Sequence, residues 1–224
     1  MRARSMAGPE PQTQTQSDAA AHLGELSRRL GNSYAMLRSI IRRSAESATS
    51  VESFAWHLEG RLDVIGRIML AAMRGPDVSF DLCRLIETEL SDQHAGGGGD
   101  TWSLNGPPVT MNSAGAEVLG LLFYELVTNS IEHGILGAED VGELQVTWRV
   151  EQGADGELLH LDWIERGAPA TSAREGFGSM VLEGMLRYQL DAEATREFGP
   201  EGVRISLSVP MRSLVQDDAG PALA

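Results

Sequence analysis

Residues 124–134 read Tyr-Glu-Leu-Val-Thr-Asn-Ser-Ile-Glu-His-Gly and decide how the rest of the chain is interpreted. The spacing predicts a helix, running from about 114 to 135, with Glu125, Asn129, Glu132 and His133 on one face. A carboxylate one turn before an asparagine amide offers the hard oxygen ligands that magnesium binds, with nucleotide phosphates completing its shell. The same four residues also suit an ordinary solvated helix face, which is the alternative.

Two downstream segments extend the pattern to a nucleotide pocket. Glu165 ends an apolar strand just before Gly167, where a carboxylate can accept a hydrogen bond from an adenine amino group. Gly176 and Gly178 then open a helix, and exposed backbone N–H groups at a helix N-terminus bind phosphate. The helix, strand and glycine loop together predict a composite nucleotide site, although Trp163 fits a core position equally well.

Around this site the chain reads as a mixed α/β domain, preceded by helices. Period-two patterns predict strands at 101–104, 143–150, 158–164 and 203–209, and helical patterns predict helices at 80–90, 114–135 and 179–190. A hairpin is expected around Gly153–Gly156. Strands that alternate irregularly with helices favour a sheet covered by helices on one face, within a domain spanning 79–211.

The first third of the chain predicts a helical hairpin over 19–75. Leucines and isoleucines at three-and-four spacing indicate helices over about 19–49 and 50–74, with Ser50 as N-cap of the second. Because one hairpin buries its apolar seam poorly, we expect a homodimeric four-helix bundle through residues 20–74; packing on the chain's own second half is the alternative. Residues 1–18 and 212–224 are expected to be flexible tails.

Composition excludes several classes of function. The 224 residues include 32 acidic and 18 basic side chains, a net charge of -14, which disfavours nucleic-acid and membrane-surface binding. Cys83 is the single cysteine, so disulfides and multi-cysteine zinc sites are excluded, and no apolar run suits a membrane span. We expect a soluble, cytoplasmic protein. Every basic residue is arginine, so arginine or backbone N–H groups must bind any phosphate.

From about residue 20 to 211 the chain resembles a histidine kinase of the HWE class, in its dimerisation hairpin and its GHKL-type ATP-binding domain. The resemblance rests on Gly60–Leu62, the Glu125 and Asn129 pair, Trp163–Glu165 and 176–185. It implies an α+β fold: a two-helix hairpin in a four-helix-bundle dimer, followed by an α/β sandwich. It further implies that Asn129 coordinates magnesium, Glu125 assists phosphoryl transfer and Glu165 reads adenine. The residues assigned to the nucleotide site are Asn129, Glu132, His133, Trp163, Glu165, Gly167, Arg174, Gly176, Phe177 and Gly178.

The departures from this family are informative. Arg28 stands where the family has its phosphoacceptor histidine, and a guanidinium has no free lone pair with which to attack a phosphoryl group. Tyr124 replaces the namesake histidine, and Glu132 replaces a phosphate-facing lysine, which reverses the charge. Arg166 and Arg174 are the nearby arginines that could offset Glu132. Binding of ATP with magnesium is therefore an open expectation. His22 and His57 are candidate substitute acceptors, with surface or seam positions as the alternative.

These features predict a two-component signalling protein without a sensor domain on its own chain, unable to autophosphorylate, that docks response-regulator receiver domains. A basic stripe on the first helix suits the acidic pocket of a receiver. It consists of Arg28, Arg29, Arg38, Arg42 and Arg43. A separate sensor protein is a candidate further partner. The alternatives are an active kinase that phosphorylates a partner in trans, on histidine or as an anti-sigma-type serine kinase, and a purely structural dimer.

Overall fold

The computed structural model describes residues 24, 31, 34–42, 44–45, 48–75, 78–93, 102–137, 142–167, 184–200 and 202–215. The chain divides into two compact units, Met1–Glu46 and Ser47–Ala224. In the first unit the described residues are helical, as predicted for 19–49. The second unit holds all the elements named below. Its helices include none, among the described residues, that is long and apolar enough to cross a membrane.

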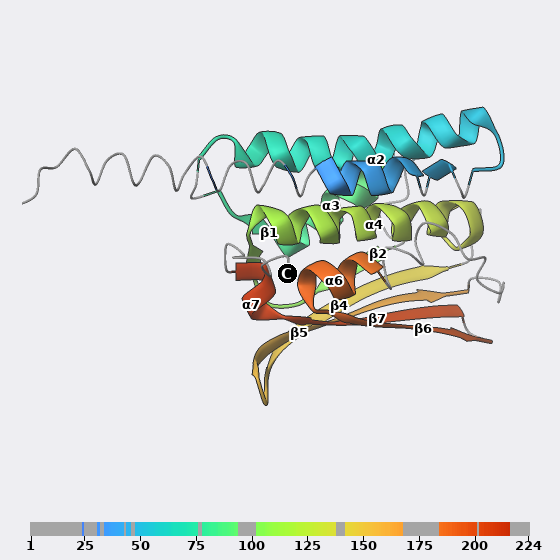
Figure 1. Cartoon of the computed structure of the whole chain (residues 1–224). Coiled ribbons are helices and arrows are strands. Elements are labelled where there is room, and N and C mark those ends of the chain that lie inside the picture. Colours follow the sequence, from blue (N-terminus) through green and yellow to red (C-terminus); the bar gives the residue numbers. More distant parts are fainter. Residues whose placement is uncertain are drawn as a thin grey trace, which may run out of the picture. The chain divides into compact units, whose positions relative to one another are not determined.

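The second unit is an α+β structure whose helices lie on one face of a mixed sheet (Figure 1). Its helices are α2 (Val51–Ala72), α3 (Leu82–Gln93), α4 (Ser113–His133), α6 (Leu186–Leu190) and α7 (Met211–Val215). Its main sheet contains β2 (Trp102–Asn105), β4 (Glu143–Gly153), β5 (Gly156–Arg166), β6 (Glu193–Gly199) and β7 (Gly202–Pro210). A second, two-stranded sheet pairs β1 (Phe80–Asp81) with β3 (Thr110–Met111).

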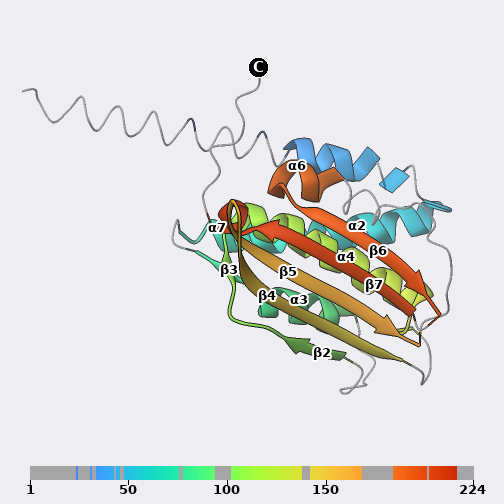
Figure 2. The same ribbon diagram turned by 90° about the horizontal axis from the view of Figure 1, so that it is seen from below.

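The five-stranded sheet has the order β2-β4-β5-β7-β6, with β2 parallel to β4 and the other pairs antiparallel (Figure 2). The predicted hairpin is confirmed: β4 and β5 pair along their full length and turn before Gly156, whose φ of +118° suits glycine. Side chains alternate along the strands, so one face is buried under the helices and the other stays polar. The buried face includes Leu144, Val146, Trp148, Leu159, Leu161, Trp163, Ile205, Leu207 and Val209.

The helix α4 occupies the centre of the unit, between the sheet and α2 (Figure 1). Asn112 caps its N-terminus, because the Asn112 side chain accepts a hydrogen bond of 2.8 Å from the Gly115 N–H. Its sequence is apolar on nearly every side, and most of its residues are buried, as expected of a helix covered by neighbours all round. This central position presents one side of α4 to α2.

The helix α2 begins after the predicted N-cap Ser50, which accepts a hydrogen bond of 3.1 Å from the Ser53 N–H. Val64 and Ile68 of α2 contact the position of Gly120 on α4, where an added Cβ would lie 3.1 and 3.0 Å from their methyl groups. Packing of the second predicted helix on the chain's own second half, the stated alternative, is thus observed. The dimeric bundle remains a prediction.

Three sequence expectations need correction or extension. The strand β6 was not predicted, because it lies at the sheet edge and none of its residues is buried enough to give an apolar alternation. The C-terminal tail was expected from 212, yet α7 runs to Val215, Leu214 is fully buried, and its carbonyl accepts a 2.7 Å hydrogen bond from Asn112 N–H. The helix predicted at 179–190 is described as α-helix only over α6, and 179–183 lie outside the described residues.

Candidate nucleotide site

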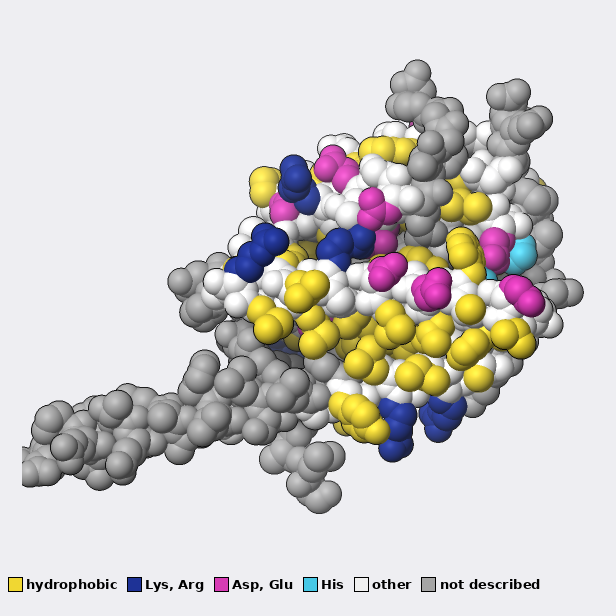
Figure 3. All heavy atoms as spheres, turned by 90° about the horizontal axis from the view of Figure 1, so that it is seen from above, with side chains coloured by type: hydrophobic (Ala, Val, Ile, Leu, Met, Phe, Trp, Pro, Cys, Tyr) yellow, Lys and Arg dark blue, Asp and Glu magenta, His cyan; other side chains and the backbone are white. Residues whose placement is uncertain are grey.

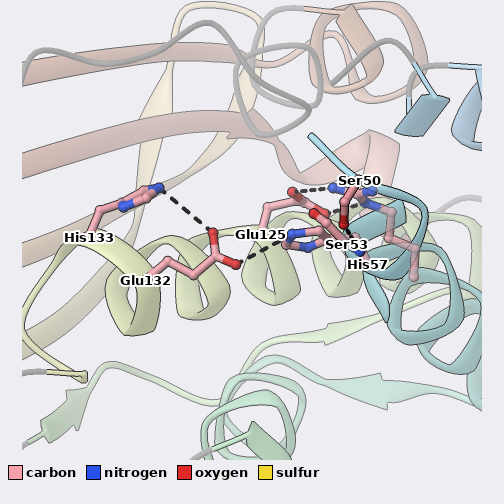
Figure 4. Close-up of polar contacts among 7 residues, drawn as sticks. Ser50, Ser53, His57, Glu125, Glu132 and His133 are labelled. Atoms are coloured by element: carbon pink, nitrogen blue, oxygen red, sulfur yellow. Dashed lines mark hydrogen bonds and ion pairs between the residues drawn. The ribbon is translucent and has the colours of Figure 1, made fainter. Parts of the chain in front are cut away.

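Glu125, the carboxylate implied to assist phosphoryl transfer, is engaged by an arginine of α2. The Arg61 Nε donates to Glu125 Oε1 at 2.7 Å, and Nη2 donates to Oε2 at 3.0 Å. The two residues are only 3% and 4% exposed. Burial raises the pKa of Glu125, and the bidentate pairing with Arg61 opposes that rise. In Figure 4, Glu125 points from α4 toward α2. Both of its oxygens therefore have a charged partner.

Tyr124, which replaces the family's namesake histidine, is buried at the same helix contact. A Cβ at Gly60 of α2 would lie 2.2 Å from the Tyr124 hydroxyl oxygen, so only glycine fits beside this ring. The hydroxyl hydrogen-bonds to Thr128, and burial raises the pKa of Tyr124 to about 12. Tyr124 is therefore a neutral packing residue in this arrangement.

Glu132 lies one turn beyond Asn129 and faces two histidines (Figure 4). Its Oε1 is 3.4 Å from His57 Nε2, and its Oε2 is 3.7 Å from His133 Nε2. Burial lowers the pKa of His57, so its imidazole is neutral at pH 7 and screens the carboxylate little. His57 thus lies in the α2–α4 contact, and its role as a substitute acceptor stays a prediction.

Asn129 is half-buried on α4, between Glu125 and Glu132, whose side chains both contact α2. Within the described part of the chain, no group of three or more His, Cys, Asp or Glu side chains could hold a metal ion. An amide oxygen alone does not hold magnesium, since this ion needs six oxygen ligands. The donor set therefore fits magnesium only if nucleotide phosphates and water supply the remaining ligands.

Glu165, the implied adenine-reading carboxylate, is 6% exposed at the end of β5. Its Oε1 accepts a hydrogen bond of 2.9 Å from Trp163 Nε1, and it also accepts from the Ser130 hydroxyl and the Ile135 N–H. Burial raises its pKa, and these three donors oppose the rise. Three donors therefore bind this buried carboxylate, and the role of Glu165 in reading adenine stays a prediction.

The other predicted site residues are only partly described. Gly167 follows β5 with a φ of +87°, a conformation that favours glycine. The predicted lid residues Arg174, Gly176, Phe177 and Gly178 lie outside the described residues, as do His22, Arg28, Arg29 and Arg43. Arg38 and Arg42 are exposed on the described helical segment of the first unit.

Two features of the site were missed from the sequence. Arg61 belongs to the Gly60–Leu62 triplet that was noticed, yet its pairing with Glu125 bridges 64 positions and has no local signal. Ser130 and Ile135, which donate to Glu165, also went unnoticed. A buried arginine on the apolar side of a helix was the signal that could have prompted a search for a partner carboxylate.

Comparison with known proteins agrees with this architecture. Residues 25–108 match the family described as HWE histidine kinase. The chain is 28% identical over 198 residues to a blue-light-activated histidine kinase of Brucella anthropi, covering 88% of this chain and 40% of that one. It is 27% identical to blue-light-activated histidine kinase 1 of Erythrobacter litoralis, covering 84% and 52%. The chain thus spans about half the length of these relatives.

Solved structures show the same fold. A blue-light activated histidine kinase of Erythrobacter litoralis superposes with a TM-score of 0.56 at 16% identity, covering 83% of this chain and 60% of that one. The histidine kinase domain from Erythrobacter litoralis gives 0.50 at 16% identity, covering 79% and 94%. Residues 25–108 therefore resemble the HWE histidine kinase family, and most of the chain is similar in sequence to blue-light-activated histidine kinases.

Proposed function

We propose that the chain is a two-component signalling protein of the HWE histidine kinase type that does not phosphorylate itself and acts by docking receiver domains of response regulators. The feature that carries this proposal is Arg28, which the resemblance to the family puts at the position of the phosphoacceptor histidine. A guanidinium stays protonated at physiological pH and offers no lone pair to a phosphoryl group. Loss of the acceptor removes autophosphorylation at that position while leaving the surrounding docking surface.

The charges on the first helix support docking to an acidic partner. Arg38 and Arg42 are exposed and four positions apart, so they lie on one side of their helix. Receiver domains carry an acidic pocket, and complementary charge speeds association and fixes the orientation of the complex. Arg28 would then enter that pocket as an inert replacement for histidine.

Dimerisation through residues 20–74 is part of the same proposal. Several large apolar side chains of α2 remain exposed, and Figure 3 shows hydrophobic side chains gathered on the face that carries this helix. They include Val51, Trp56, Leu62 and Leu70. A second copy would cover this surface in the arrangement of a four-helix bundle.

The docking proposal is tested by measuring binding of a panel of purified receiver domains to the full chain by calorimetry. Arg28→Glu should weaken binding by tenfold or more, because it places a like charge against the acidic pocket. Arg187→Glu makes the same charge change at an exposed position of α6 and serves as the matched control. Equal affinities for the parent chain and the Arg28→Glu variant would disprove the docking role of Arg28.

Binding of ATP with magnesium is proposed for the pocket formed by Asn129, Glu165 and Gly167 with the lid residues. The half-buried amide of Asn129 and the carboxylate of Glu165 at the end of β5 support it. Calorimetric titration with magnesium-ATP should show binding that Asn129→Ala abolishes. If the parent chain does not bind magnesium-ATP, the nucleotide proposal is wrong and the docking proposal stands without it.

The second candidate is an active kinase that phosphorylates a partner protein in trans, which the retained Glu125 and Asn129 favour. It requires transfer of radiolabel from ATP to a partner histidine, serine or threonine, lost in Asn129→Ala. The burial of Glu125 beside Arg61 weighs against this activity in the described conformation, because a general base must reach the proton that it takes up and this residue is only 4% exposed.

A further inference from the structure

A charged side chain interrupts the apolar, helix-covered face of the main sheet at its edge. The strand β6 lies at the end of the strand order, beside β7 (Figure 2). Arg196 of β6 pairs with Ile205 of β7, and Ile205 pairs with Trp163 of β5. Residues paired across antiparallel strands project to the same face, and Ile205 and Trp163 are 3% and 0% exposed. Arg196 therefore lies on the same face as Glu165, which follows Trp163 by two positions.

The contacts of Arg196 place its guanidinium toward the end of β5. In the next row of the sheet Phe198 pairs with Val203, and Val203 pairs with Glu165. The Arg196 Cζ lies 5.8 Å from the centroid of the Phe198 ring, within the range of a cation–π contact. The guanidinium thus extends from its own row toward the row of Glu165. Burial raises the pKa of Glu165, and the positive charge of Arg196 is one of the influences that oppose this rise.

The end of α4 borders the same carboxylate. A Cβ at Gly134 would lie 2.2 Å from Glu165 Oε2, so Glu165 lies directly against the residue that ends α4. Asn129 of the proposed nucleotide pocket lies five positions earlier on this helix. The base end of that pocket thus has a hydrogen-bond acceptor, Glu165, and a strong donor, Arg196, on one face of one sheet.

We propose that Arg196 binds the base of the nucleotide by donating to a ring nitrogen of adenine, while Glu165 accepts from the amino group beside that nitrogen. The inference rests on the proposed function, since it deepens the assignment of the adenine end of the same pocket. The 6-amino group of adenine is a donor, and the ring nitrogens N1 and N7 on either side of it are acceptors. An acceptor and a neighbouring donor on the protein match this edge of the base.

Phe198 suits the role of orienting the guanidinium. The Phe198 side chain is 42% exposed, so its ring is not committed to the core of the domain. A guanidinium is planar, stays protonated and stacks on aromatic rings, and such a contact restrains the direction of its donors. A donor group that is already oriented loses less conformational freedom when the ligand binds.

The same pair of residues disfavours guanine. Guanine has a carbonyl oxygen at position 6, so an acceptor would face the Glu165 carboxylate with no proton between them. Arg196 does not discriminate by itself, because O6 and N7 of guanine also accept hydrogen bonds from arginine. In this arrangement Glu165 selects the base, and Arg196 strengthens its binding.

Calorimetric titrations of the full chain with the magnesium complexes of ATP, 1-deaza-ATP and 7-deaza-ATP test the contact. Each analogue replaces one ring nitrogen by C–H and keeps the amino group and the triphosphate. The parent chain should bind ATP about tenfold or more tightly than one of the two analogues. Arg196→Leu should bind ATP as weakly as that analogue, because leucine has no donor. Equal binding of all three nucleotides by the parent chain, or an undiminished preference in Arg196→Leu, would overturn the proposal.

Arg204→Leu is the matched control. Arg204 of β7 lies on the opposite, polar face of the sheet, where its side chain is 50% exposed and 3.4 Å from Asp162. Each leucine variant removes one positive charge, so a general loss of attraction for the triphosphate lowers the affinity for all three nucleotides alike. Arg196→Leu should also change the ratio of the affinities for ATP and the analogue, whereas Arg204→Leu should not. An equal change of this ratio in both variants would assign it to net charge and overturn the contact.

Arg196→Lys keeps the test decisive if the leucine variant does not fold. Lysine retains a positive charge near Glu165, but its ammonium is not a planar group that stacks on Phe198. The preference for ATP over the analogue should fall about threefold or more in this variant. An unchanged preference would show that the guanidinium of Arg196 does not contact the base.

The titrations separate this inference from the proposed function. If the parent chain binds no ATP, the nucleotide pocket and the role of Arg196 are both wrong. If the parent chain binds ATP, Asn129→Ala abolishes the binding and neither deaza analogue binds more weakly, then the role of Arg196 alone is wrong and the nucleotide pocket stands.

Discussion

Trp163 and Glu165 lie two positions apart on β5, so both side chains point to the helix-covered face of the sheet, and the indole Nε1 donates to Glu165 Oε1 at 2.9 Å. Trp163→Phe keeps the aromatic packing and deletes this donor to a buried carboxylate. We expect a loss of ~1.5–3 kcal/mol in the free energy of unfolding, measured by urea titration.

Trp148→Phe is the matched control for this change. The Trp148 indole donates at 2.7 Å to a neutral acceptor, the Pro107 carbonyl, so its loss should cost ~0.5–1.5 kcal/mol. Equal costs for the two variants would show that the charge of Glu165 does not strengthen its hydrogen bond.

Two glycines of α2 should respond in opposite directions to alanine. At Gly60 a Cβ would lie 2.5 Å from two ring carbons of Tyr124, so Gly60→Ala must displace α2 or the ring and should cost ~1–3 kcal/mol. At Gly66 nothing lies within 4 Å of the added Cβ, and Gly66→Ala should stabilise the helix by ~0.5–1 kcal/mol. Thermal unfolding of both variants checks this difference, and destabilisation of equal size would contradict the described α2–α4 register.

Glu89 should make stability depend on pH. Burial raises its pKa from 4.5 to about 7 despite the Arg67 guanidinium beside it. Between these two values the folded chain holds a proton that the unfolded chain has released, so the free energy of unfolding falls as the pH rises through this interval, by up to ~3 kcal/mol. Glu89→Gln cannot ionise and should remove this part of the pH dependence, measured by urea titration between pH 4.5 and 8.

The control for Glu89 is its neighbour on the same arginine. Asp92 also pairs with Arg67, but its side chain is 56% exposed and its charge raises the pKa of Glu89 less than burial does, so Asp92→Asn should leave most of the slope of stability against pH in place. If Glu89→Gln retains the parent slope, another buried group is responsible for it.

Glu132 should limit the affinity for magnesium-ATP. By the resemblance described above, its carboxylate is expected at the position of a phosphate-facing lysine, and His57 beside it is neutral at pH 7. Glu132→Lys replaces repulsion of the phosphates by attraction. It should raise the affinity for magnesium-ATP about tenfold or more, measured by calorimetry at fixed ionic strength. Glu132→Gln should give an intermediate value. A lower affinity in the lysine variant would show that Glu132 does not face the phosphates.

Local patterns predicted much of this fold because its helices and inner strands have strong periodicity. The capping residue Ser50, the β4–β5 hairpin and the long buried α4 follow from apolar spacing and turn chemistry. The edge strand β6 has no buried face, and α7 becomes ordered because Leu214 packs against the start of α4, where a Cβ at Gly115 would lie 2.9 Å from it. The edge position of β6 and the packing of Leu214 depend on segments that are far apart in the chain, so a short window of sequence does not predict either element.

The candidate site was predicted in its residue types but less well in its contacts. Glu125, Asn129 and Glu132 do share α4, as their spacing indicated. The position of α2 over these residues depends on long-range packing of Gly60 and Gly120, and the sequence favoured a dimer seam, with intrachain packing as the alternative. The pairing of Glu125 with Arg61 was therefore missed, although both residues were noticed.

The α2–α4 contact has a consequence for assembly. Every copy of the chain carries both helices, so α2 of one copy can pack on α4 of another with the same ion pairs and the same close packing at the glycines. The short connection after Gly75 favours closure within one chain, because it gives α2 a high effective concentration near its own α4. A dimer would bring the α4 of a second chain close to α2 and so reduce that advantage. Exchange of α2 between subunits would then form only contacts that the isolated chain already makes.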